Sequence, residues 1–261
     1  MKPGAAPFAQ NEVLFGRDNT PGIVSAQLQG DDRITVYRRL EGKITTETQS
    51  FRPFLWVTEQ TFLQGFDRKV EYVPLTGSGA FKFLVLLQSW PDFQRARNFL
   101  RNAPVLAPND PVQQYLMATG RTSFKGMRFA QLHRLQIALT AGNTIQLADN
   151  TGWQSEVRKP DELVAVIRKR DPDVIEGHDI FRSILPRIAG KRSLKLGRDG
   201  SVMSARQSRV QIAERTIQYP KYEIHGRQIV DTFLLAVFYD VSTRELESFD
   251  LDEVAGHFGL K

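Results

Sequence analysis

Residues 171–187 read DPDVIEGHDIFRSILPR, and this stretch decides the fold. A turn around Pro172 leads into a short apolar run at 174–175, which a polar group at 176–179 follows. From residue 180 to 189, apolar side chains recur with helical spacing. In open α/β sheets, ligands usually bind where a strand ends and leads into a helix. The stretch therefore predicts a strand, a functional sheet edge and a helix, in that order.

The flanking patterns extend this architecture. Short runs of apolar and β-branched residues between turn signals predict strands, and three- and four-residue apolar spacing predicts helices. Alternating strands and helices indicate a layered α/β domain, so the predicted fold class is α/β. The strands are expected at 132–139, 144–148, 174–175 and 227–231, a hairpin between 210–212 and 222–224, and helices at 160–170, 180–189, 232–238 and 246–258.

An α+β domain is expected before this one. Residues 1–20 are rich in Gly, Pro, Asn and Ala and are expected to form a flexible arm. The predicted domains are then 21–125 and 126–261, because Gly and Thr punctuate the chain between 119 and 126. Phe51, Phe54 and Trp56 are expected in the core of the first domain. Its strands are predicted at 34–39, 43–48, 52–57 and 81–87, and its helices at 91–102 and 111–119, the second capped by Asp110.

Composition bounds the class of protein. Of 261 residues, 41% are hydrophobic and 25% charged, as in soluble globular proteins. No apolar run approaches the roughly 20 residues of a membrane span, and the start, MKPGAAPFAQNEV, lacks the apolar core of a signal peptide. No membrane partner and a cytoplasmic, nucleoid-associated location are therefore expected. The absence of cysteine excludes disulfides and thiolate metal sites.

Positive charge is concentrated beyond the predicted functional edge. The formal net charge is +6, which favours polyanionic partners. Between residues 182 and 209, eight basic residues stand against one acid, Asp199. We predict that they contact nucleic-acid phosphates; the alternative is a solvated, flexible loop. They are Arg182, Arg187, Lys191, Arg192, Lys195, Arg198, Arg206 and Arg209.

Carboxylates decide whether this fold could cleave phosphodiesters. Such hydrolysis usually uses two divalent ions roughly 4 Å apart, held by several carboxylates. The central strand, LQIALT at 135–140, has none. Asp171 and Asp173 lie at the N-terminal end of a strand and are expected to form a turn. Glu176, Asp179 and Asp231 lie at the carboxyl ends of strands, where they could bind a metal. The alternative is helix capping: Asp179 would cap the helix that begins at residue 180, and Asp231 the helix that begins at residue 232.

Five segments in order carry a family resemblance. They are FRPFLWV (51–57), DPVQQYLMATGRTSFKGMRF (110–129), HRLQIAL (133–139), DPDVIEGHDIFRSILPRI (171–188) and GRQIVDTFLLAVFYDVSTRELESFDLDEVAGHFG (226–259). The chain resembles family B DNA polymerases over their N-terminal and 3′–5′ exonuclease regions, without palm, fingers or thumb. The resemblance implies that residues 126–261 form a ribonuclease H-like domain with a mixed sheet.

The resemblance also implies that the exonuclease carboxylates are missing. The first family motif, Asp-x-Glu, falls on Ala138 and Thr140. The second, Asn-x-x-x-Phe-Asp, places its Asn at Asp179, its Phe at Ser183 and its Asp at Ile184. The third, Tyr-x-x-x-Asp, is expected beyond the segment that resembles 246–259, so the sequence ends before it. Three metal-binding positions therefore carry Ala, Thr and Ile, and no cofactor is expected.

Three functions follow as hypotheses. The first is a catalytically inactive structural or DNA-binding component in replication or repair. It would bind primer–template or single-stranded DNA, and a separately encoded polymerase subunit is its candidate protein partner. The second is an active, Mg²⁺- or Mn²⁺-dependent exonuclease with a rearranged site of Glu176, Asp179 and Asp231. The third is a protein-interaction scaffold. Under the first, Phe181, Tyr219 and Tyr222 could stack on bases; the alternative is that they belong to the core.

Overall fold

The computed structural model describes residues 16–190 and 192–260. The chain divides into two compact units, the first ending at Gly126 and the second beginning at Met127. Each unit is described by itself. Most of the predicted arm at 1–20 lies outside the described residues.

The first unit contains two antiparallel sheets. One has the order β1-β2-β3 and the other β5-β6-β4-β7. The hairpin predicted between 34–39 and 43–48 is confirmed, with Glu41 and Gly42 both at positive φ in the turn (49° and 79°), as a two-residue type I′ turn requires. The strands are β1 (Ile23–Gln29), β2 (Arg33–Leu40), β3 (Lys43–Ser50), β4 (Phe54–Val57), β5 (Glu71–Pro74), β6 (Phe83–Leu86) and β7 (Val105–Leu106).

Helices of the first unit begin where the sequence provides caps. Helix α3 (Pro111–Thr119) follows Asp110, whose carboxylate accepts the Gln113 N–H at 2.9 Å, so the predicted cap is confirmed. Helix α2 (Trp90–Phe99) begins after Ser89, and η2 (Gln60–Leu63) is a single 3₁₀ turn. Phe51 and Phe54 are buried as predicted, and the half-buried Trp56 packs edge-on against Phe54.

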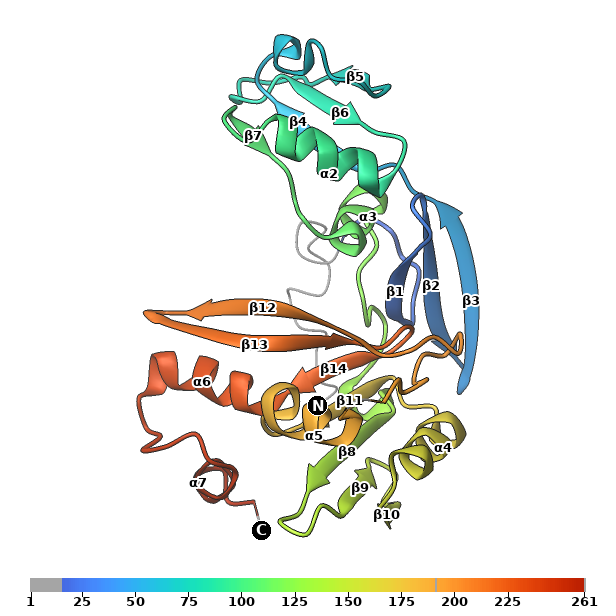
Figure 1. Cartoon of the computed structure of the whole chain (residues 1–261), viewed down its shortest axis with the longest axis vertical. Helices are drawn as coiled ribbons and strands as arrows, with labels where there is room; N and C mark the ends of the chain where they lie inside the picture. The colour runs from blue at the N-terminus through green and yellow to red at the C-terminus, as the bar shows by residue number, and fades with distance from the viewer. Residues whose placement is uncertain (1–15, 191, 261) are drawn as a thin grey trace, which may run out of the picture. The chain divides into compact units, whose positions relative to one another are not determined.

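The second unit is built on a five-stranded mixed sheet (Figure 1). Its order is β10-β9-β8-β11-β14: β8, β9 and β10 are antiparallel neighbours, while β11 and β14 run parallel to β8. The predicted α/β class is therefore confirmed. The strands are β8 (Arg134–Leu139), β9 (Ile145–Asp149), β10 (Gln154–Val157), β11 (Val174–Gly177) and β14 (Gln228–Asp231), and the helices are η3 (Phe129–Gln131), α4 (Pro160–Arg170), η4 (Ile180–Ile184), α5 (Leu185–Ala189), α6 (Thr232–Thr243) and α7 (Leu251–His257).

The two faces of this sheet differ in chemistry. Successive side chains of a strand point to opposite faces. Leu135 and Ile137 of β8 are buried in the main core of the unit, together with residues of α4, η4 and α5. Gln136 and Ala138 alternate with them and are exposed. One face therefore holds the core, and the other is polar and open.

The helix predicted at 180–189 forms in two parts. Residues Ile180–Ile184 make a π-helical turn, in which the Leu185 N–H donates to the Ile180 carbonyl, and α5 follows. Pro186 has no N–H to donate to the Arg182 carbonyl, so a regular α-helix would lose a hydrogen bond here. The wider turn removes that conflict, and single π turns of this kind are often found near functional sites.

The predicted pairing of 210–212 with 222–224 is wrong. Strands β12 (Ser204–Ile212) and β13 (Arg215–Glu223) form a longer hairpin, in which Val210 pairs with Ile217 and Tyr222 with Ala205 (Figure 1). The polar run from 204 to 209 carries little β signal of its own, and backbone pairing with β13 supplies what its side chains lack. Among residues 16–190 and 192–260, no helix is long and apolar enough to cross a membrane.

Candidate functional site

Asp231 organises the carboxyl edge of the second sheet. It ends β14, and its carboxylate accepts three backbone N–H groups: Asp179 at 2.9 Å, Phe181 at 3.3 Å and Phe233 at 3.0 Å. The last contact caps α6 as predicted, and the other two fix the turn before η4. Burial raises the pKa of Asp231 above its ordinary value, and the nearby Asp179 acts in the same direction, against the three N–H donors. This carboxylate ties two helices to one strand end.

The other two carboxylates at this edge are also engaged. Asp179 adopts a left-handed backbone (φ 55°), and its side chain accepts Arg182 Nε at 2.6 Å and the Ser183 hydroxyl. Glu176 projects from β11 and accepts Arg134 Nη1 at 2.9 Å. The predicted cap at Asp179 is wrong, because its carboxylate accepts these side chains and no backbone N–H of η4. The acids at this edge are therefore held by donors within the protein.

The three positions at which the sequence resemblance leads us to expect metal ligands carry other chemistry. Ala138 lies on the open face of β8. Thr140 follows β8, and its hydroxyl accepts the Thr144 N–H at 3.1 Å in the turn to β9. Ile184 is buried in the core. None of these side chains supplies the carboxylate oxygens that Mg²⁺ or Mn²⁺ prefers.

The acids that are present do not fit a divalent ion. An ion at this edge would compete with the three N–H donors for Asp231, with Arg182 for Asp179, and with Arg134 for Glu176. Within the part of the chain that the structure describes, no three His, Asp or Glu side chains are grouped so that they could hold a metal.

Asp171 and Asp173 lie at the opposite edge and do more than form a turn. Asp173 is fully buried and accepts Arg198 Nη2 at 2.8 Å, and Asp171 accepts Arg198 Nε at 2.8 Å and Arg227 Nη1 at 2.7 Å. Burial favours a raised pKa for Asp171, but Arg198 and Arg227 hold it below the ordinary value. Burial and the neighbouring Arg198 lower the pKa of Arg227. The four residues form a buried network of two acids and two guanidinium groups.

The prediction that Arg198 binds a phosphate is therefore wrong. Its side chain is only 6% exposed, and it also donates to the Gly226 carbonyl at 2.6 Å and the Pro172 carbonyl at 3.0 Å. A guanidinium in this setting has no free face for a phosphate. Sequence reasoning counted it as surface charge because the contact partners lie 25 to 28 positions away along the chain.

Two of the remaining basic residues are held in ion pairs, and four are accessible. Arg182 pairs with Asp179 and lies 4.2 Å from the Phe233 ring centroid, and Arg206 pairs with Glu223 at 3.1 Å. Arg187 is exposed and donates to the Asn143 amide oxygen at 2.7 Å. Lys191 lies outside the described residues. Those whose side chains are accessible and not held by a carboxylate in an ion pair are Arg187, Arg192, Lys195 and Arg209.

The aromatic residues proposed for base stacking mostly serve packing. Phe181 is 6% exposed and packs on the Tyr219 ring, with centroids 5.2 Å apart. Tyr219 and Tyr222 are half-buried against the same core. Stacking by Phe181 is therefore wrong, because its ring faces are covered.

Two arginines that the sequence did not single out form ion pairs with the acids of the sheet edges. Arg134 is 42 positions from Glu176, and Arg227 is 56 positions from Asp171. Only sheet pairing brings them together: β11 lies between β8 and β14 and parallel to both. No local pattern in the sequence marks either arginine.

A cleft of about 900 Å³ opens over the polar face of the sheet. Its floor is formed by β8, β9, β10 and β11, including Ala138 and Glu176, and its other wall by α6 and α7. His178, at the end of β11, bridges the two sides: its ring nitrogens lie 3.1 Å from the Thr232 hydroxyl and 2.7 Å from the Phe249 carbonyl. His178 thus connects the floor of the cleft to its helical wall.

Comparison with known proteins shows the fold. No family model matches the sequence, and no curated protein matches it. Among solved structures, the chain is similar to the family B DNA polymerase from the hyperthermophilic archaeon Pyrobaculum calidifontis, with a TM-score of 0.65 and 16% identity. The match covers 91% of this chain and 39% of the polymerase. At this identity the likeness establishes a distant polymerase-like fold, and this chain spans less than half the length of that relative.

Proposed function

We propose that this chain is a catalytically inactive, family B polymerase-like protein that binds DNA as a structural component in replication or repair, in the cytoplasm. The observation that carries the proposal is the state of the carboxyl edge. Ala138, Thr140 and Ile184 stand where the family resemblance places metal ligands, and the acids nearby are held by protein donors. Hydrolysis by two metal ions needs carboxylates free to bind them.

DNA binding is supported by the accessible basic residues and by the polymerase-like fold. Each phosphate that a Lys or Arg neutralises releases counterions, so affinity falls as salt rises. Among its described residues, the segment from 182 to 209 retains four such residues after the buried Arg198 and the paired Arg182 and Arg206 are set aside. We propose single-stranded or primer–template DNA as the ligand and a separately encoded polymerase subunit as a further partner.

Nuclease activity is tested directly. The full chain is incubated with labelled single-stranded DNA and a mismatched primer–template, with Mg²⁺ or Mn²⁺, and the products are separated by length. We expect intact DNA. Metal-dependent degradation that Asp179→Ala abolishes would overturn the inactive assignment in favour of a rearranged exonuclease site.

DNA binding is tested by fluorescence anisotropy at several salt concentrations. For single strands the logarithmic salt slope changes by about 0.7 per phosphate contact, so loss of four contacts flattens it by roughly 3. We expect this flattening for a variant with Ala at positions 187, 192, 195 and 209, and an unchanged slope for a control with Ala at four exposed basic positions of the first unit. The control positions are Arg33, Lys43, Lys69 and Lys82.

A protein-interaction scaffold would give a different result. Undetectable DNA binding at about 50 mM salt, where phosphate contacts are strong, would refute the DNA-binding part of the proposal. A flattened slope in the first-unit control alone would place the contacts outside the basic segment.

A further inference from the structure

The cleft over the sheet has two unlike walls. Its floor is the open sheet face, where Gln136, Gln146 and Gln154 alternate with inward-facing core residues. Its opposite wall comes from α6 and α7 and is apolar. The apolar side chains that line this wall are Leu235, Ala236, Leu251, Val254, Ala255, Phe258 and Leu260.

Large apolar side chains on this wall are exposed to an unusual degree. Leu235 is 55% exposed, Leu251 52%, Phe258 48% and Leu260 66%. Single exposed leucines are ordinary, but several that line one cleft, bordered by polar groups, mark a binding surface. The volume, about 900 Å³, lies at the upper end of the roughly 300–1,000 Å³ that ligand pockets span. The cleft thus suits a ligand with a substantial apolar face.

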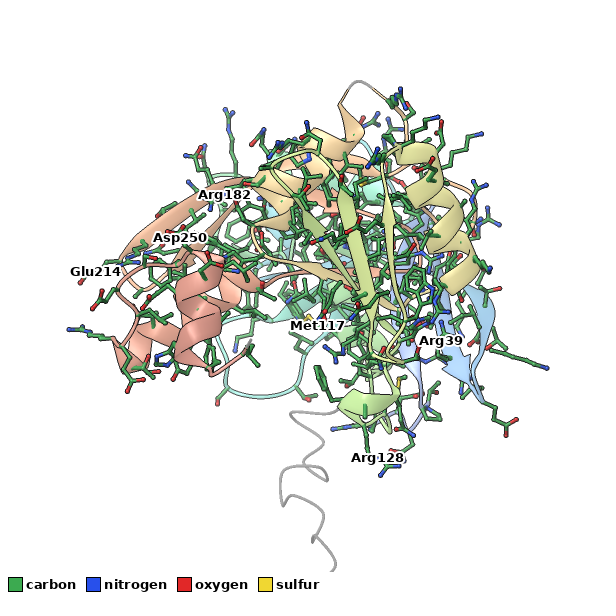
Figure 2. The ribbon with its side chains drawn as sticks, turned by 90° about the horizontal axis from the view of Figure 1, so that it is seen from below. Arg39, Met117, Arg128, Arg182, Glu214 and Asp250 are labelled. Carbon is green, nitrogen blue, oxygen red and sulfur yellow. The ribbon has the colours of Figure 1, made fainter. Side chains whose placement is uncertain are left out.

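Acidic residues outnumber basic ones in the segment that supplies the helical wall of the cleft, although the chain is basic as a whole. Glu156 lies in the floor, and so does Glu176, whose charge Arg134 offsets. Between residues 232 and 260, six carboxylates stand against one arginine, Arg244. In Figure 2, Asp250 and the hairpin-tip residue Glu214 are labelled on the same side of the second unit as Arg182, whose charge Asp179 offsets. The six carboxylates are Asp240, Glu245, Glu247, Asp250, Asp252 and Glu253.

We propose that this cleft docks a cationic amphipathic helix of a partner protein. The apolar stripe of such a helix would pack on Leu235, Leu251 and Phe258, with anchors spaced i, i+3 or i+4 and i+7. Its Lys and Arg residues would face the carboxylates of the cleft, which gives orientation and a fast, salt-dependent association. A nucleic acid is disfavoured here, because its phosphates would face the same carboxylates. The inference stands apart from the DNA binding proposed for the basic segment.

A synthetic helix tests the docking. The probe is a labelled Leu/Lys peptide of about 15 residues with its leucines on one face, a length near the lower limit for helix formation in isolation. Two control peptides keep the length: one has the same composition in scrambled order, and the other has Glu in place of Lys. Binding to the full chain is followed by anisotropy, and we expect only the ordered Leu/Lys peptide to bind.

Variants locate the peptide. We expect Leu235→Ala and Leu251→Ala each to weaken binding by about tenfold, the effect of removing one hot-spot contact. The matched control is Val202→Ala, which truncates an apolar residue that is 41% exposed and outside the cleft and should leave the affinity unchanged. Glu156→Gln combined with Asp252→Asn should weaken binding and flatten its salt dependence. Thermal melts matching the parent protein establish that every variant is folded.

Four results would overturn the proposal. They are equal binding of the scrambled or acidic peptide, unchanged affinity in the two leucine variants, displacement of the peptide by a single-stranded oligonucleotide, and concentration-dependent dimerisation that Leu251→Ala abolishes. The third would make the cleft a nucleic-acid site, and the fourth would make a second copy of the chain its occupant. Failure here leaves the salt-slope experiment on the basic segment unaffected, so the two proposals are separable.

Discussion

Replacing Arg198 by Ala separates stability from DNA binding. In the native protein, Arg198 joins Asp171, Asp173 and the carbonyls of Gly226 and Pro172 through hydrogen bonds of 2.6 to 3.2 Å. The substitution removes the guanidinium from a carboxylate whose side chain is fully buried. Breaking a buried pair from one side costs about 3–5 kcal/mol, because the remaining charge stays in a poorly solvated place.

The expected loss lies at the lower end of that range. Arg227 still donates to Asp171 at 2.7 Å in the variant, and Asp173 keeps the His133 N–H at 3.3 Å. The two guanidinium groups also repel each other, which contributes to the lowered pKa of Arg227, and the variant removes this repulsion. We therefore expect a loss of about 3 kcal/mol, or a fall in Tm of roughly 10 °C for a unit of this size.

The assay pairs urea unfolding with DNA binding. Arg198→Ala should lower the unfolding midpoint of the second unit without changing the salt slope of DNA binding by the folded protein. Arg209→Ala, in the same basic segment but exposed, should leave the free energy of unfolding within about 0.5 kcal/mol of the parent and flatten the salt slope of DNA binding by about 0.7. A variant Arg198→Ala with parental stability and a flattened slope would refute the buried network and restore Arg198 to the phosphate-binding set.

Three further predictions concern positions that fix the local structure. Asp231→Asn should cost about 1–3 kcal/mol at acidic pH, since an amide nitrogen replaces one acceptor of backbone N–H groups. The pKa of Asp231 is raised in the folded state, so its contribution to stability is fully present below the ordinary carboxyl pKa of 3.8 and is lost as pH rises through the folded pKa. The difference from the parent in urea unfolding should therefore shrink towards neutral pH. Gly177→Ala should cost about 1–3 kcal/mol in the same assay, because a Cβ there would lie 2.6 Å from the Ile137 carbonyl oxygen; parental stability would contradict the close approach of β11 to β8. Gln114→Leu should destabilise the first unit by about 1–3 kcal/mol, because the Gln114 amide accepts the Phe54 N–H at 2.7 Å, and calorimetry should show the second unit melting unchanged.

The sequence predicted the elements of the second unit better than their contacts. Helix α4 forms over the predicted 160–170, and the strand from 174 and the cap at Asp231 are confirmed. These features depend on signals a few residues long: a Pro at the first turn, an apolar run, a carboxylate two residues before an N–H. The hairpin register failed because nine backbone pairs, rather than side-chain pattern, fix β12 against β13.

Ala138, Thr140 and Ile184 show what the sequence determines by itself. No fold can place a carboxylate where the chain carries a methyl, a hydroxyl or a butyl group, so the chemistry of these positions is set by composition alone. The free or engaged state of Asp179, Asp231 and Arg198 is different, because a charge becomes a phosphate ligand, a cap or a buried partner only through neighbours tens of residues away. Tertiary structure decided those roles, since burial and distance set the energy of a charge, and neither is encoded locally.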